Sequence, residues 1–368
     1  VGSEMCIRDR PHPALDANCF SVVWTGSVVM PRTMDGCIGL STQDSMRLYV
    51  DDKLLIDGWG KDKSADQALD FHFEAGRTYK IRIEFVNDRR GARVIFGYSA
   101  GRENFPAAVE AARKADVAIL CMGDNEETSG ENFDRTDLNL PGRQLELVQA
   151  VYATGTPVVL VLQSGRPVTA NWENDHLPAI LEAWFPGEQG GTAIAKTLFG
   201  DAAPGGRLPI TFPRSVGQIP CHYSRRPGGG KRYVEMDWLP LYPFGYGLTY
   251  TTFAYRDMAL SRSVIDPQDT VTVSVTVTNT GKYTGDAVPQ LYVRDMFSSV
   301  VKPERQLAAF RRLTLAPGES RRVELTVGPK QLRTLGPDYV WRVEPGKFEL
   351  QLGDNAENIL LRADLTVE

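Results

Sequence analysis

The fold of this chain is decided by residues 117–122, Val-Ala-Ile-Leu-Cys-Met, and by the acid-rich segment that follows them. The apolar run has the length and composition of a buried strand. The segment includes residues 129–142, Ser-Gly-Glu-Asn-Phe-Asp-Arg-Thr-Asp-Leu-Asn-Leu-Pro-Gly. In an open α/β sheet, ligands bind in the crevice outside the carboxyl ends of the strands. The sequence therefore predicts a candidate catalytic loop at such an edge, and Glu131 is its most interesting carboxylate.

Two interpretations of this loop compete when only its residues are considered. Exposed carboxylates are ordinary on protein surfaces, so a solvated acidic loop without a chemical role is the simpler interpretation. The other is a loop that carries a general acid. In that case Glu131, Glu126 and Glu127 are the candidates.

Residues 101–250 are predicted to form repeated β-α units around this loop. The helix at 106–115 is rich in helix formers and begins at Pro106, where the missing N–H costs nothing. The other expected elements are a helix at 144–153, strands at 117–122, 157–162 and 180–184, and a helix at 190–198. Such alternation predicts a parallel sheet covered by helices.

Residues 11–100 show an all-β pattern. Residues 46–50 and 54–57 flank Asp51-Asp52, which is a hairpin signal, and alternation continues through 79–85 and 92–96. A β-sandwich is the expected result. Residues 1–10 match no downstream pattern and lack the features of a secretory signal, so they are interpreted as an assembly or cloning remnant. The natural N-terminus is then expected to be missing.

Residues 251–368 are again predicted to be all-β. In residues 271–278 every odd position is valine and every even position carries a hydroxyl group, which predicts one face in a core and the other in water. Further strands are expected at 290–293, 322–327 and 348–352. This pattern favours an immunoglobulin-like sandwich.

Composition narrows the classes of partner. With 368 residues, 24% charged and 42% hydrophobic, the chain has the size and composition of two or three globular domains. A formal net charge of −5 gives no electrostatic reason to expect nucleic acid or an anionic membrane, and no apolar run is long enough to span a bilayer. A neutral sugar is compatible with this small net charge.

Neither a metal nor a cofactor is predicted. The five cysteines show no Cys-x-x-Cys pair, Cys121 is expected to be a buried small hydrophobe, and the four histidines are scattered. A dinucleotide-binding protein is excluded because no Gly-x-Gly-x-x-Gly follows the strand at 117–122.

Three ordered motifs resemble one known family. Residues 130–144, Gly-Glu-Asn-Phe-Asp-Arg-Thr-Asp-Leu-Asn-Leu-Pro-Gly-Arg-Gln, are similar to the acid/base loop of family 3 glycoside hydrolases, the β-glucosidase and β-xylosidase group. Residues 184–191, with 198–201 and 204–209, resemble the second signature of that family's α/β-sandwich domain. Residues 242–250, Tyr-Pro-Phe-Gly-Tyr-Gly-Leu-Thr-Tyr, resemble the crossing into its fibronectin type III-like domain. Their order along the chain makes chance agreement improbable.

The resemblance implies three domains. They are a partial protective-antigen-like β-sandwich at 11–100, a partial C-terminal α/β-sandwich domain at 101–250 and a fibronectin type III-like domain at 251–368. It also implies a retaining, exo-acting β-glycosidase, β-glucosidase first, with its nucleophilic Asp in a preceding (β/α)₈ barrel. Such a barrel needs about 200 residues or more, which this chain does not offer. We therefore expect the chain to be the C-terminal portion of a longer enzyme, without a nucleophile of its own.

In the family, the Glu three residues before the Asp-Arg pair is the proton donor, which implies that Glu131 is the acid/base. Glu126 and Glu127 fit this spacing less well. Asp134 and Arg135 are expected to support the loop through a charge-assisted contact with each other.

Other residues are weaker candidates. Trp184, Phe185, Trp238 and Tyr242 could stack on sugars, but packing in apolar strands and at a domain junction is the stronger interpretation for each. His222 and Asp237 have no supporting spacing.

The expected substrate is a β-linked oligosaccharide or glycoside. A homo-oligomer is left open, and the resemblance slightly favours a periplasmic or extracellular location. The alternative function is a non-catalytic carbohydrate-binding or adhesion module. Such a module would have no need of Glu131 in its motif, and this distinguishes the two.

Overall fold

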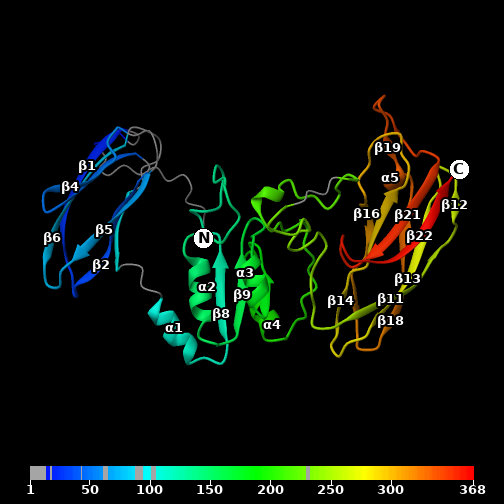
Figure 1. Cartoon of the computed structure of the whole chain (residues 1–368), viewed down its shortest axis with the longest axis horizontal. Helices are drawn as coiled ribbons and strands as arrows, with labels where there is room; N and C mark the ends of the chain where they lie inside the picture. Colours follow the sequence, from blue (N-terminus) through cyan, green and yellow to red (C-terminus); the bar gives the residue numbers. More distant parts are fainter. Residues whose placement is uncertain are drawn as a thin grey trace. The chain divides into compact units, whose positions relative to one another are not determined.

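The structure is a computed structural model that describes residues 14–16, 19–42, 44–60, 65–87, 94–100, 105–228 and 233–368. Residues 1–10, with Cys6, and also His12 lie outside the described residues. The chain divides into two compact units, Val1–Pro106 and Ala107–Glu368. Figure 1 shows the elements of each unit. No helix within the described ranges is both long and apolar enough to cross a membrane.

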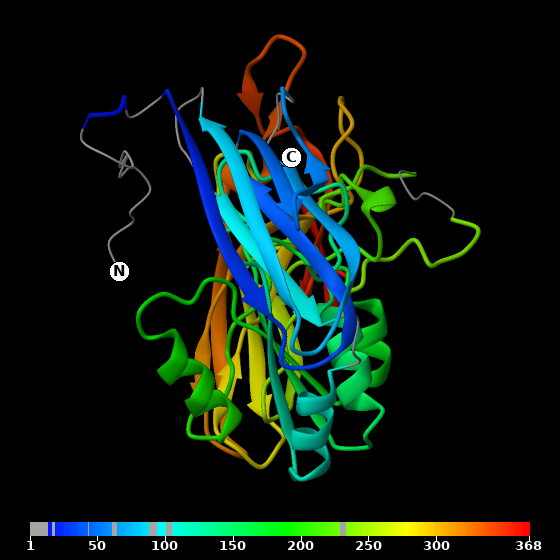
Figure 2. The ribbon, with the colours of Figure 1, turned by 90° about the vertical axis from the view of Figure 1, so that its left-hand side faces the viewer.

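The first unit is a β-sandwich made of two antiparallel sheets (Figure 2). One sheet has the order β1-β6-β3-β4 and the other has the order β5-β2-β7. The strands are β1 (Phe20–Val29), β2 (Met34–Thr42), β3 (Ser45–Val50), β4 (Lys53–Asp57), β5 (Ala65–Phe73), β6 (Thr78–Asn87) and β7 (Val94–Ala100). Buried side chains of both sheets form one core, which confirms the predicted sandwich.

The β3–β4 hairpin follows from its two turn residues. Asp51 and Asp52 both have positive φ angles, 48° and 65°, as a two-residue turn that matches the strand twist requires. A carboxylate oxygen of Asp51 accepts a hydrogen bond from the backbone N–H of Lys80 at 2.9 Å. The predicted hairpin is therefore confirmed.

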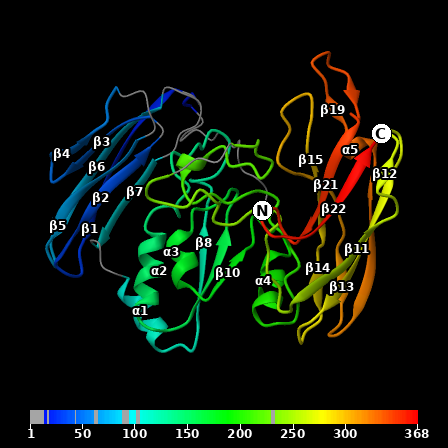
Figure 3. The ribbon, with the colours of Figure 1, turned by 45° about the vertical axis from the view of Figure 1, so that its right-hand side comes forward.

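The second unit begins with an α/β domain around a parallel sheet of order β10-β9-β8 (Figure 3). Apolar side chains of α1, α2 and α3 form one core with the sheet. The elements are α1 (Pro106–Arg113), β8 (Ala118–Gly123), α2 (Gln144–Tyr152), β9 (Val158–Gln163), α3 (Asn171–His176), β10 (Ala179–Glu182), α4 (Gly190–Leu198) and the short 3₁₀ helix η1 (Val216–Gln218). The predicted β-α alternation is confirmed.

The prediction that Cys121 is buried is wrong. Ala118, Leu120 and Met122 pack against the core that includes helix α2, and Cys121 lies at the opposite parity of the strand. Because β8 is one of the two edge strands of the three-stranded sheet, Cys121 is exposed, and its thiol is free.

The rest of the second unit is a β-sandwich with a three-stranded sheet, β11-β13-β18, and a five-stranded sheet, β12-β22-β21-β15-β16. Two short pairs, β14-β17 and β19-β20, complete it. The elements are β11 (Phe253–Leu260), β12 (Val264–Ile265), β13 (Val271–Asn279), β14 (Gly285–Ala287), β15 (Gln290–Asp295), β16 (Gln306–Phe310), β17 (Leu313–Leu315), β18 (Ser320–Val327), α5 (Pro329–Leu332), β19 (Thr334–Leu335), β20 (Trp341–Arg342), β21 (Gly346–Gly353) and β22 (Ile359–Val367). The predicted fold class, α/β combined with β-sandwiches, is confirmed.

Strand β13 corrects one detail of the prediction. Its four valines are fully buried, as expected, but the hydroxyl face is not in open water. Because β13 pairs with β11 and β18 on its two sides, Ser274 is buried and accepts a hydrogen bond from Arg322.

Candidate active site

Polar residues stand at the carboxyl ends of all three parallel strands. Asp124 follows β8, Ser164 follows β9, and Glu182 ends β10. Ser164 is fully buried, and the Asp124 side chain is only 3% exposed. These three side chains therefore form a polar cluster at the carboxyl ends of the strands, beneath the loops of this edge.

Gly123 fixes the way the chain leaves β8. Its φ angle is 140°, and a Cβ there would overlap the backbone of Gln163. The side chain of Gln144 accepts from its N–H at 2.7 Å and donates to its C=O at 2.8 Å. The strand end is thus tied to helix α2 before the acidic loop begins.

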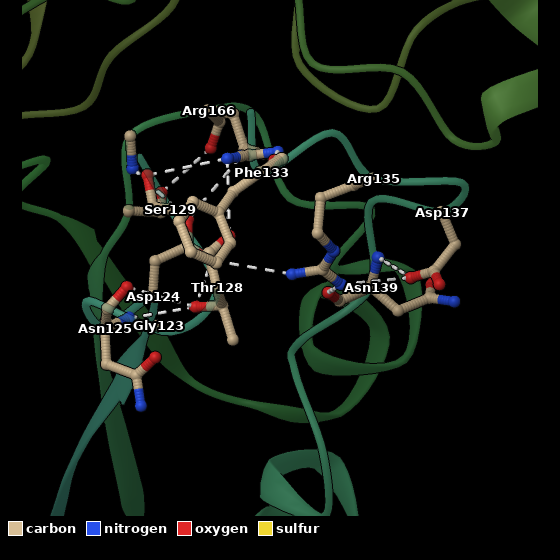
Figure 4. Close-up of polar contacts among 12 residues, drawn as sticks. Gly123, Asp124, Asn125, Thr128, Ser129, Phe133, Arg135, Asp137, Asn139 and Arg166 are labelled. Carbon is tan, nitrogen blue, oxygen red and sulfur yellow. Dashed lines mark hydrogen bonds and ion pairs between the residues drawn. The ribbon is translucent and has the colours of Figure 1, made fainter. Parts of the chain in front are cut away.

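Asp124 is the buried anchor of this loop (Figure 4). Its carboxylate accepts hydrogen bonds from Thr128 Oγ1 at 3.1 Å and from the backbone N–H of Gly165 at 3.4 Å. It also pairs with Arg135 Nη1 at 3.5 Å and with Arg166 Nε at 3.8 Å. One buried carboxylate is therefore the shared counter-charge of two guanidinium groups.

The expected Asp134–Arg135 pair is not formed. Arg135 pairs with Asp124 and, at 3.2 Å, with Asp137, and it donates to the C=O of Asn139 at 2.9 Å. Asp134 is exposed. The guanidinium of Arg135 reaches back to the strand end instead. The supporting role of Arg135 stays a proposal.

Glu131 lies in the exposed turn of the loop. The backbone N–H of Phe133 donates to the C=O of Gly130 at 3.2 Å, and Asn132 has a φ angle of 66°. Phe133 is 45% exposed beside it. Glu126 and Glu127 lie in a separate turn, where Asn125 accepts from the backbone N–H groups of residues 127–129.

Glu182 was not singled out from the sequence. Burial raises the pKa of its carboxyl to about 7, and the charge of Asp124 acts in the same direction. Oε1 accepts from the Trp184 N–H at 2.9 Å and lies 3.4 Å from Ser164 Oγ, whose proton is donated to the closer C=O of Arg166 at 2.9 Å. Within the part of the chain that the structure describes, Oε2 is buried without a hydrogen-bond partner. Such a carboxyl favours its protonated form.

Of the weaker candidates, only Phe185 lies beside the loop. Phe185 is 58% exposed and lies over Gly165, beside Ser129 of the loop. Trp184 is half-buried and packs edge-on against Phe212. The hydroxyl of Tyr242 donates to Asn174 at 2.8 Å.

Trp238 and His222 line a separate cavity of about 80 Å³ that no residue of the loop lines. Arg225 also lines this cavity, and its guanidinium stacks over Trp238. Asp237 accepts from the backbone N–H of Leu239 at 3.0 Å and so closes a local turn. None of these groups contributes to the site around Glu131.

The other two family motifs hold the α/β domain against the second β-sandwich. Gln290 of β15 donates to the C=O of Gly245 at 3.0 Å and to the C=O of Asp354 at 2.6 Å, and Tyr292 donates to Gln290 Oε1 at 2.6 Å. Arg207 donates to the C=O of Asp286 at 3.4 Å. These motifs therefore have a packing role.

Sequence reasoning missed Asp124, Ser164, Glu182 and Arg166. Asp124 and Ser164 had a readable signal, because each follows the carboxyl end of a predicted strand, whereas Glu182 lies in the middle of the strand predicted at 180–184 and ends the shorter observed strand β10. Arg166, in Gly165-Arg166-Pro167, had none.

Comparison with known proteins now identifies the family. The Glycosyl hydrolase family 3 C-terminal domain matches residues 23–250, and the Fibronectin type III-like domain matches residues 287–356. The chain belongs to glycosyl hydrolase family 3. This confirms the resemblance seen in the three motifs. The predicted domain boundaries and the protective-antigen-like character of the first sandwich stay predictions.

The relatives and solved structures are glycosidases. A "Beta-xylosidase" of Formosa agariphila is 45% identical over 302 residues, which are 79% of this chain and 42% of the relative. A "Periplasmic beta-glucosidase" of Salmonella typhimurium is 42% identical over 68% of this chain and 34% of its own length. The β-glucosidase of Kluyveromyces marxianus in complex with glucose has a TM-score of 0.73 at 28% identity, over 97% of this chain and 46% of that one. This family 3 chain thus spans less than half the length of these relatives.

Proposed function

We propose that this chain supplies the acid/base residue, Glu131, of a retaining, exo-acting β-glycosidase, with β-glucosides as the first substrates to test. The main observation in support of this proposal is the position of Glu131. It lies in an exposed turn at the carboxyl edge of the parallel sheet, and two arginines tie its loop to buried Asp124. The relatives named β-glucosidase and β-xylosidase support the substrate class.

Glu131 acts twice in this mechanism. In the first step its proton goes to the glycosidic oxygen, the C–O bond breaks, and the aglycone leaves as an alcohol while a second carboxylate bonds to the anomeric carbon. In the second step Glu131 takes a proton from water, and the water oxygen bonds to that carbon while the bond to the second carboxylate breaks, which releases the sugar and frees the carboxylate. The second carboxylate is proposed to lie outside this chain, about 5 to 5.5 Å from Glu131.

The environment of Glu131 has to change when substrate binds. A general acid near neutral pH needs surroundings that favour its protonated form. Because Glu131 is exposed here, the bound sugar and the facing carboxylate are proposed to supply them. Asp134 and Arg135 are proposed to support the loop, now through separate contacts. A periplasmic or extracellular location is proposed from the name of the Salmonella relative.

Two measurements test this function. The isolated 368-residue chain is expected to leave aryl β-glucosides intact, and turnover above that of its Glu131→Ala variant would mean that a second carboxylate within the chain acts as nucleophile. In a family 3 enzyme that carries this chain together with a barrel domain, Glu131→Ala should slow hydrolysis by about 10² to 10⁴ when the leaving group is poor.

Azide provides the decisive readout in that enzyme. A small anion can attack where the missing carboxylate would have activated water, so azide should speed deglycosylation of Glu131→Ala and give a β-glycosyl azide. If Glu126→Ala or Glu127→Ala shows this signature and Glu131→Ala does not, the assignment moves to the upstream turn.

A further inference from the structure

We propose that Arg166 is a positioning residue for the acid/base loop. Its guanidinium holds the turn that carries Glu131, and Asp124 holds the guanidinium. This inference rests on the proposed function of Glu131 and adds a residue from another segment, the loop after β9, to the same site.

Arg166 contacts residues on both sides of Glu131 in the sequence, and Figure 4 shows its guanidinium beside Thr128, Ser129 and Phe133. Nη1 donates to the C=O of Phe133 at 3.3 Å, and Nη2 donates to the C=O of Thr128 at 3.4 Å. Nη2 also reaches Ser129 Oγ at 3.5 Å. These distances are at the long end for hydrogen bonds, so each bond is weak. Together they hold the backbone on the two sides of the turn that carries Glu131.

Arg166 is itself fixed from the side of the sheet. Its Nε faces Asp124 Oδ2 at 3.8 Å, and its C=O accepts a hydrogen bond from Ser164 Oγ at 2.9 Å. Pro167 follows, which restricts the backbone of Arg166 to extended conformations. The guanidinium therefore connects the end of the strand to the exposed side of the loop.

The geometry of the arginine fork is essential to this role. A guanidinium is planar and carries five donors, so it can bond two carbonyl groups and one carboxylate at once. A lysine ammonium at the same position keeps the charge but is a point on a flexible stem. Because misplacement of a catalytic group by about 1 Å can cost up to about 10² in rate, a loosened turn should slow proton transfer in particular.

The first experiment measures loop order in the 368-residue chain by hydrogen–deuterium exchange. In Arg166→Gln and Arg166→Lys, amides of residues 129–135 should exchange roughly tenfold faster, because both variants lack the fork, while helix α2 stays unchanged. Arg262→Gln is the control, since it removes an exposed pair with Asp269 in the second sandwich. Unchanged exchange in the loop, or faster exchange throughout the second unit, would overturn the proposal.

The second experiment measures kinetics in a family 3 enzyme that carries this chain with a barrel domain. Arg166→Gln and Arg166→Lys should lower kcat/KM, which reports the glycosylation step, roughly tenfold for alkyl glycosides and much less for dinitrophenyl glycosides. Equal loss for both leaving groups, or full activity of Arg166→Lys, would contradict a positioning role.

The two experiments separate this inference from the proposed function. If the Arg166 variants loosen the loop but azide rescues Glu126→Ala instead of Glu131→Ala, Arg166 still positions the loop and the assignment of Glu131 fails. If azide rescues Glu131→Ala and the Arg166 variants behave like the unaltered protein, the assignment stands and the role of Arg166 is refuted.

Discussion

The loop that carries Glu131 and the segment at residues 242–247 both belong to family motifs, yet they are held in different ways. The loop is exposed and is held by two arginine side chains around one buried carboxylate. In the segment, the carbonyl groups of Phe244 and Gly245 accept hydrogen bonds from the second sandwich, and Gly245 is buried. A Cβ on Gly245 would overlap the Gln290 side chain.

This difference agrees with the roles proposed for the two motifs. In the loop, the contacts order the backbone and leave the Glu131 carboxylate facing solvent, where a substrate can reach it. In the segment, the backbone carbonyl groups are themselves the hydrogen-bond acceptors. Leaving such buried groups without partners lowers the stability of the fold. Changes at the loop should therefore affect chemistry, whereas changes at the segment should affect stability alone.

The largest effect on stability is expected from Asp124→Asn. The substitution leaves Arg135 and Arg166, whose side chains are only 17% and 24% exposed, without their shared counter-charge. Removing one partner of a buried ion pair costs about 3 to 5 kcal/mol. Urea unfolding of the chain, followed by tryptophan fluorescence, measures the change.

Asp137→Asn is the matched control for Asp124→Asn. Its carboxylate also pairs with Arg135, but its side chain is 52% exposed. An exposed pair contributes at most about 1 kcal/mol, so this variant should unfold almost as the unaltered chain does. Equal losses in the two variants would contradict the view that burial at the strand end anchors the loop.

The next effect concerns pH and Glu182, at the same edge of the sheet. A pKa of about 7 in the folded chain, above the ordinary 4.5, means that folding favours the protonated form. The resulting stabilisation is complete below about pH 4.5 and is lost as the pH rises through 7, by about 3 kcal/mol in total. Glu182→Gln stays neutral and should lack this loss.

The measurement is the free energy of unfolding of both proteins between pH 4.5 and 8. The variant should become more stable than the unaltered chain as the pH rises. Glu146→Gln, an exposed change at the start of helix α2, is the control and should leave the pH dependence unaltered. Parallel curves for Glu182→Gln and the unaltered chain would show that Glu182 titrates normally.

The sequence predicts the elements of both regions better than their contacts. The strand before the loop, the helix after it and the hairpin at Asp51-Asp52 follow from local periodicity and turn chemistry, which depend on neighbours in sequence. Asp124 had a readable position after a strand. Arg166 did not, because its contacts are to loop residues more than thirty positions away.

Cys121 and Asp134 show where local reasoning fails. Apolar neighbours predicted a buried Cys121, but burial depends on which elements cover a sheet edge, and β8 is an edge strand. Adjacency predicted an Asp134–Arg135 pair, but the buried carboxylate of Asp124 offers Arg135 a partner in a less screened environment. Both outcomes depend on parts of the fold that local sequence does not show.

The smallest of these effects, and the one that tests the segment, is expected from Gln290→Ala. The substitution leaves the carbonyl groups of Gly245 and Asp354 without their donor and Tyr292 without its acceptor. Unpaired buried groups of this kind cost about 1 to 3 kcal/mol, and unfolding in urea measures the loss. Gln306→Ala, at an exposed position of β16, is the control.

Because Gln290 touches no residue of the Glu131 loop, exchange of residues 129–135 and the dependence of kcat/KM on the leaving group should stay unchanged. A change in either would show that the segment transmits its packing to the loop, and the division between a chemical motif and a packing motif would then be wrong.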